Sequence, residues 1–103
     1  MSPSLGIDRA KVAGFCRRWK VRELSLFGSV LSDDFGPDSD VDVLVSFAPD
    51  AHPGLFELVR MTEELEKMLG RKVDLVTRPA VEESENYIRR RHILEHLETV
   101  YVA

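Results

Sequence analysis

The sequence predicts one α/β (α+β) domain, because segments of helical period alternate with short segments of period two along its 103 residues. Apolar residues recur with helical spacing in three segments, at 7–19, 55–69 and 82–96. Strand-like runs lie in four segments, at 21–27, 40–47, 72–77 and 99–102. A chain of this length forms a single domain with a modest core, so residues 1–103 are expected to fold as one unit.

The composition excludes several classes of protein. Cys16 is the single cysteine, so the chain has no internal disulfide, and we expect Cys16 in the core of a cytoplasmic protein. The net charge of −4 argues against direct binding of nucleic acid through a basic surface. No signal peptide and no apolar run long enough for a bilayer is visible, so we expect no contact with a membrane.

The most informative stretch begins where the strand at 21–27 ends. Gly28 and Ser29 follow that strand, and a short helix is expected after them, so backbone N–H groups and the Ser29 hydroxyl could hold an anion such as phosphate. Ten residues later, Asp40 and Asp42 point to one face of the next strand while the valines between and after them point to the other. Two neighbouring carboxylates favour a compensating hard cation such as Mg²⁺.

A simpler interpretation of the same stretch is a solvated acidic loop. Gly-Ser is common in turns, and four aspartates, Asp33, Asp34, Asp38 and Asp40, surround Gly36-Pro37, which are ordinary turn residues. The fixed spacing, the apolar strand before Gly28 and the apolar strand around Asp42 together favour the functional interpretation.

Other polar residues need an explanation as well. Asp74 interrupts the strand at 72–77, where Asp is disfavoured, so it lies either on a solvated face or beside Asp40 and Asp42. The arginines at 89–91 could bind triphosphate or an acidic partner, but a solvated helix face is the preferred interpretation. The segment at 55–69 should end at Gly70, and Trp19 is expected to pack in the core. His92 and His96 lack the further ligands of a zinc site.

Gly28-Ser29, ten residues and Asp40-x-Asp42 together resemble the signature of the DNA polymerase β-like nucleotidyltransferases. With the flanking Leu26-Phe27 and Val43-Leu44-Val45, the chain is similar to the minimal nucleotidyltransferase (MNT) antitoxins of HEPN/MNT toxin–antitoxin pairs. The resemblance implies a small mixed sheet with helices packed on one face, and it places Asp74 with the other two acids. Ser32 departs from the family, because such relatives commonly have arginine there.

The resemblance also implies an activity. Asp40, Asp42 and Asp74 would hold Mg²⁺, with two ions expected, while Gly28 and Ser29 bind the terminal phosphates of ATP. AMP would then be transferred to a hydroxyl, expected to be tyrosine, of a HEPN-domain toxin. The alternative is a non-catalytic antitoxin that masks its partner sterically. The oligomeric state stays open, a homo-oligomer included.

Overall fold

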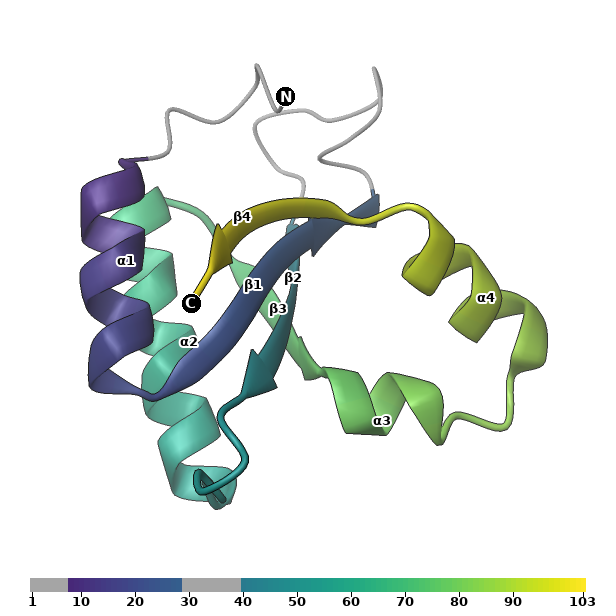
Figure 1. Ribbon diagram of the computed structural model, residues 1–103. Coiled ribbons are helices and arrows are strands. Elements are labelled where there is room, and N and C mark those ends of the chain that lie inside the picture. The colour runs from purple at the N-terminus through teal and green to yellow at the C-terminus, as the bar shows by residue number, and fades with distance from the viewer. Residues whose placement is uncertain (1–7, 29–39) are drawn as a thin grey trace.

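The computed structural model describes residues 8–28 and 40–103, which form a four-stranded sheet with helices on both faces (Figure 1). The elements in chain order are α1 (Arg9–Arg18), β1 (Val21–Phe27), β2 (Val41–Phe47), α2 (Leu55–Leu69), β3 (Val73–Thr77), α3 (Arg78–Glu82), α4 (Tyr87–Glu95) and β4 (Glu98–Val102). The strand order is β3-β2-β1-β4, in which β1 pairs antiparallel with β2 and β4 while β2 and β3 are parallel. The sheet is therefore mixed, and the predicted α/β (α+β) class is confirmed.

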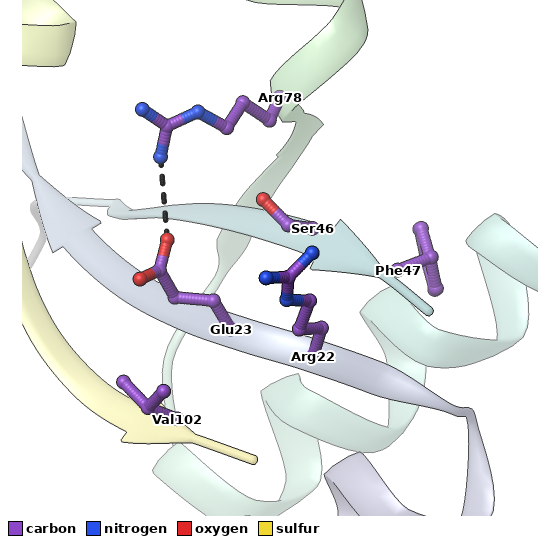
Figure 2. A pocket seen from close by; sticks show the side chains of 6 residues that line it. All are labelled: Arg22, Glu23, Ser46, Phe47, Arg78 and Val102. Atoms are coloured by element: carbon purple, nitrogen blue, oxygen red, sulfur yellow. Dashed lines mark hydrogen bonds and ion pairs between the residues drawn. The ribbon is translucent and has the colours of Figure 1, made fainter. Parts of the chain in front are cut away.

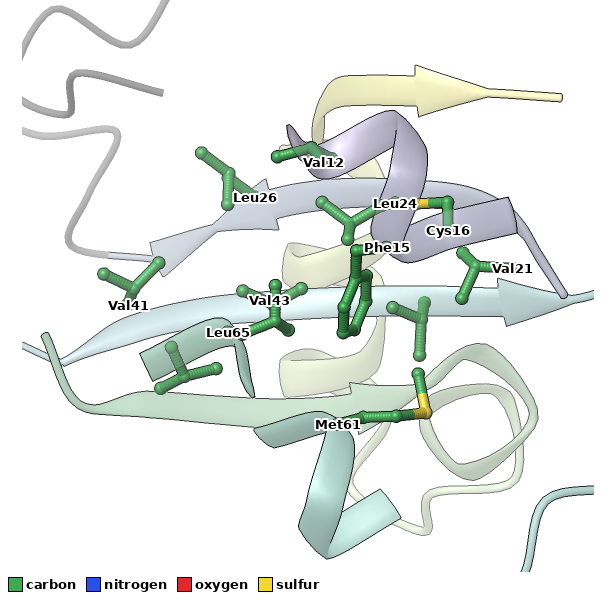
Figure 3. Packing of buried hydrophobic residues seen from close by; sticks show 12 residues of the cluster. Val12, Phe15, Cys16, Val21, Leu24, Leu26, Val41, Val43, Met61 and Leu65 are labelled. Carbon is green, nitrogen blue, oxygen red and sulfur yellow. The ribbon is translucent and has the colours of Figure 1, made fainter. Parts of the chain in front are cut away.

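The main core lies between the sheet and the helices α1 and α2. Alternate side chains of β2, namely Val41, Val43 and Val45, are fully buried on this side. They pack in one cluster with Phe15 of α1 and Met61 of α2, as Figure 3 shows. Because strand side chains alternate between faces, this burial directs Asp42 to the opposite side of the sheet. Cys16 belongs to the same buried cluster and Trp19 packs against its edge, as predicted.

A smaller cluster covers part of the opposite face. Phe27 and Leu44 of the two central strands are buried there against Val81 of α3 and Ile93 of α4. The expectation of helices on one face is therefore correct for α1 and α2 but incomplete, because α3 and α4 pack on the other face (Figure 1). We call the side of the sheet that carries Asp42, Leu44 and Phe27 the acidic face.

The predicted helix at 82–96 begins too early, because α3 ends at Glu82 and α4 begins only at Tyr87. α3 begins earlier, with Pro79 in its first turn, where the missing N–H of proline has no intrahelical partner to lose. α4 begins after Asn86, whose side-chain Oδ1 accepts a 3.0 Å hydrogen bond from the backbone N–H of Arg89. This N-cap stops the preceding turn from continuing as one helix.

The other predicted boundaries agree closely with the structure. β1 spans the predicted 21–27 and α2 spans 55–69, ending at Gly70 with left-handed backbone (φ +68). The remaining strands and α1 differ from their predicted bounds by one or two residues. No helix in the described ranges combines the length and apolar character needed to cross a membrane.

Candidate functional site

The end of β1 depends on Gly28, whose backbone is left-handed (φ +78). Residues with a Cβ rarely adopt this conformation. A Cβ at this position would also overlap the Oδ2 atom of Asp42, since Phe27 and Asp42 are register partners on the two central strands. The structure therefore brings Gly28 and Asp42 together. Ser29, Ser32 and the short helix expected after Ser29 lie outside the described residues.

Asp42 and Asp74 are direct register partners on the parallel strands β2 and β3. Paired parallel strands lie about 4.8 Å apart, so the two carboxylates leave the sheet side by side. The backbone N–H of Val41 donates a 2.9 Å hydrogen bond to the carbonyl of Lys72, which fixes this register at its start. Asp40 is exposed immediately before β2. Asp74 lies beside Asp42 and is also exposed, so both positions considered for it apply at once.

The acidic residues affect one another electrostatically. Burial raises the pKa of the Asp42 carboxyl above its usual range, and the nearby charges of Asp74 and Asp40 raise it further. The Arg89 guanidinium acts in the opposite direction. A cation bound between the carboxylates would relieve this repulsion and favour the ionised form of Asp42.

Arg89 is a neighbour of the site for which the sequence favoured a solvated helix face over a role in binding. It belongs to an arginine run that is typical of a solvated helix face, yet its charge lowers the pKa of Asp42. The signal that could have found it is its spacing from Ile93. Residues four apart share one helix face, and Ile93 is buried against the sheet.

The donor chemistry at this site fits a hard divalent cation, because Mg²⁺ prefers carboxylate oxygens and the acids already repel one another. In the described parts of the chain, no three His, Cys, Asp or Glu side chains stand ready to hold a metal ion together. The exposed side chains of Asp40 and Asp74 would have to turn toward Asp42 to share one. His92 and His96 instead stack on each other, with ring centroids 4.5 Å apart.

A hollow of about 310 Å³ opens at the end of the acidic face away from Asp42. Figure 2 shows Arg22 and Glu23 of β1, Ser46 of β2 and Arg78 around it. Arg78 forms an ion pair with Glu23 (3.2 Å), which ties α3 to β1, and a second one with Glu82 (3.3 Å) within α3. Because these pairs neutralise Arg78, the hollow has little net charge for a ligand, and the acids around Asp42 remain the better candidate site.

A comparison with known protein families connects this geometry to a function. The nucleotidyltransferase domain family matches residues 10–98. The chain belongs to this family. The match includes the segment from Gly28 to Asp42 and the strand that carries Asp74. The recognised resemblance to nucleotidyltransferases is therefore confirmed.

This nucleotidyltransferase is similar to curated proteins and to solved structures. The protein adenylyltransferase MntA of Thermococcus cleftensis is 41% identical over 64 residues, which are 62% of this chain and 63% of the relative. A chain of a toxin–antitoxin structure with AMP-PNP has the same fold, with a TM-score of 0.70 and 18% identity, covering 94% of this chain and 75% of that one.

A second similar structure contains the tri-AMPylated HEPN toxin of Shewanella oneidensis in complex with an MNT antitoxin. Its matched chain gives a TM-score of 0.61 at 18% identity, covering 92% of this chain and 70% of that one. At this identity the likeness establishes the fold alone. The chain also spans slightly less than two thirds of the length of the first curated relatives it matches.

Proposed function

We propose that this nucleotidyltransferase is a Mg²⁺-dependent protein adenylyltransferase that transfers AMP from ATP to a tyrosine hydroxyl of a HEPN-domain toxin and thereby acts as its antitoxin. The observation that carries the proposal is the paired position of Asp42 and Asp74 beside the left-handed turn at Gly28. That arrangement supports the proposal, because it brings two carboxylates next to a glycine at the start of the Gly28-Ser29 motif.

The comparisons support the substrate and the partner. The curated relative that is 41% identical is named as a protein adenylyltransferase, which specifies both the AMP group and a protein acceptor. The similar solved structures contain a nucleotide analogue in one case and an AMPylated HEPN toxin in another. The chain also retains three acids that a purely steric antitoxin would not need, namely Asp40, Asp42 and Asp74.

In the proposed reaction, the residues bind the phosphates, hold the metal ions and accept the proton. The N–H groups after Gly28 and the Ser29 hydroxyl hold the terminal phosphates of ATP. Asp40 and Asp42 hold the Mg²⁺ ions, with Asp74 as a further ligand. When bound, Mg²⁺ neutralises phosphate charge and lowers the pKa of the attacking hydroxyl. The tyrosine oxygen forms a bond to the α-phosphorus, the bond to pyrophosphate breaks, and Asp74 accepts the hydroxyl proton.

The test uses the purified chain, Mg-ATP and the protein encoded next to it, with intact mass as the readout. We expect the partner to gain the mass of AMP, and peptide mapping to find it on tyrosine. The double variant Asp40→Asn/Asp42→Asn should bind the partner but leave it unmodified. A partner that is neutralised equally by this double variant, without any gain of mass, would make the chain a masking antitoxin.

A further inference from the structure

The three consecutive arginines of α4 differ in their contacts. The Arg91 side chain forms an ion pair with Glu95 at 3.2 Å. Arg90 donates to the carbonyl oxygen of Glu82 at 3.0 Å and lies over the Tyr87 ring. Within residues 8–28 and 40–103, the Arg89 guanidinium has no hydrogen-bond or ion-pair partner at contact distance. Arg89 therefore keeps its donors available for a ligand.

Arg89 also lies on the side of α4 that faces the sheet. Ile93, one helical turn further along, is buried against Phe27 and Leu44 on the acidic face. Side chains four residues apart share a helix face, whereas Arg91 is about 200° away from Arg89 around the axis. The pair Arg91–Glu95 accordingly belongs to the outer face, while Arg89 points along the same side as Ile93.

A small hollow brings Arg89 close to β3, the strand that carries Asp74. Arg89 lines a space of about 120 Å³ between α3 and α4, together with Val76 of β3, Val81 and Ile93. Val76 follows Asp74 by two residues on the same face of β3, a distance of about 7 Å along the strand. This shared hollow puts the Arg89 guanidinium near the margin of the acidic site, and its charge accordingly lowers the pKa of Asp42.

We propose that the Arg89 guanidinium binds the phosphate chain of the nucleotide at this site, an inference that rests on the proposed function. Three carboxylates alone repel a triphosphate, so a fixed cation at their margin favours the nucleotide over free metal. Guanidinium offers a planar set of donors that matches two phosphate oxygens at once, which an ammonium group does not.

The test compares Arg89→Gln with Arg91→Gln, which removes the same charge from the outer face of the same helix. Calorimetry measures binding of Mg-ATP, of adenosine and of Mn²⁺ alone. We expect Arg89→Gln to weaken Mg-ATP binding by on the order of 10- to 100-fold and to leave adenosine binding unchanged. Mn²⁺ should bind Arg89→Gln as well as wild type or more tightly, because a nearby positive charge is gone. The Mg-ATP affinity of Arg89→Lys should lie between those of wild type and Arg89→Gln.

The outcomes separate this inference from the function on which it rests. If wild type binds Mg-ATP and Arg89→Gln binds it as well as Arg91→Gln does, Arg89 is not a phosphate contact. A parallel loss of Mn²⁺ and Mg-ATP binding would likewise overturn the proposal, because Arg89 would then act by positioning the acids. A wild-type protein that binds no Mg-ATP would reject the proposed function itself and this assignment with it.

Discussion

At the scale of single residues, Gly28 and Asp42 depend on each other for space. Gly28→Ala puts a methyl group where the Asp42 carboxylate lies and forces a left-handed backbone on alanine. We expect the backbone strain to cost about 1–2 kcal/mol of stability. Displacement of Asp42 should weaken Mg-ATP binding by roughly 10-fold or more, equivalent to about 1.4 kcal/mol. Thermal melting and calorimetry measure the two effects separately.

Gly70→Ala is the matched control for this prediction. Gly70 also has left-handed backbone (φ +68), but a Cβ there would meet nothing within 4 Å. The two variants should lose similar stability, and only Gly28→Ala should lose nucleotide affinity. Equal affinities in the two variants would mean that the position of the Asp42 carboxylate does not matter for binding.

Asp74→Asn should separate nucleotide binding from transfer. Asparagine keeps the shape of Asp74 but loses the charge and the basicity that the acceptor hydroxyl requires. We expect Mg-ATP affinity to fall modestly and AMP transfer to slow by ~100-fold, the loss typical of a positioned general base. Single-turnover transfer to the partner measures the rate, with Glu63→Gln on the exposed side of α2 as a control. AMP transfer by Asp74→Asn at nearly the wild-type rate would show that Asp74 is not part of the site.

At the scale of elements, α4 is positioned by its N-cap residue and one buried side chain. Asn86→Ala removes the acceptor for the Arg89 N–H, and such an N-cap loss costs about 1 kcal/mol. We expect faster hydrogen exchange in α4 than in wild type, while α2 stays protected. Asn86→Asp retains an acceptor oxygen and should exchange like wild type. Uniformly faster exchange in all helices would show that α4 does not open independently.

The same elements explain how far the sequence could predict the fold. Period and end signals located β1 and α2 correctly, because alternating burial and the Gly70 stop are local properties. The pairing of Asp42 with Asp74 needed the family resemblance, since register between distant strands has no local signal. The turn between α3 and α4 was missed because the apolar pattern hides the Asn86 cap. Arg89 was interpreted as part of a solvated helix face, because its actual environment comes from two other elements, β3 and α3.

At the scale of the whole molecule, Cys16 reports on global unfolding. Burial raises the pKa of its thiol from an ordinary 9.0 to about 12. The Cys16 thiol therefore ionises at a lower pH in the unfolded chain than in the folded one. As a result, the free energy of unfolding should fall as pH rises from 9 toward 12. Denaturant titrations at several pH values measure how steeply the free energy of unfolding falls with pH. The fall should be less steep in Cys16→Ala than in wild type. Alkylation of the native thiol should be slow and should proceed only through unfolding.

An unchanged slope in Cys16→Ala would assign the alkaline loss of stability to other groups. Rapid alkylation of the native protein, at a rate independent of its stability, would show that α1 opens locally over Cys16. Either result would contradict the tight packing of this residue between α1 and the sheet.

Because β2 and β3 pair in one register, each molecule should either bind nucleotide fully or not bind it at all. Val73 is buried on the side of β3 opposite Asp74, so sliding β3 by one residue would turn the carboxylate into the apolar core and expose valine. A molecule with this pairing error cannot keep a weakened site, because it has lost the native core as well. The number of nucleotide sites titrated per chain in a preparation should therefore equal its folded fraction.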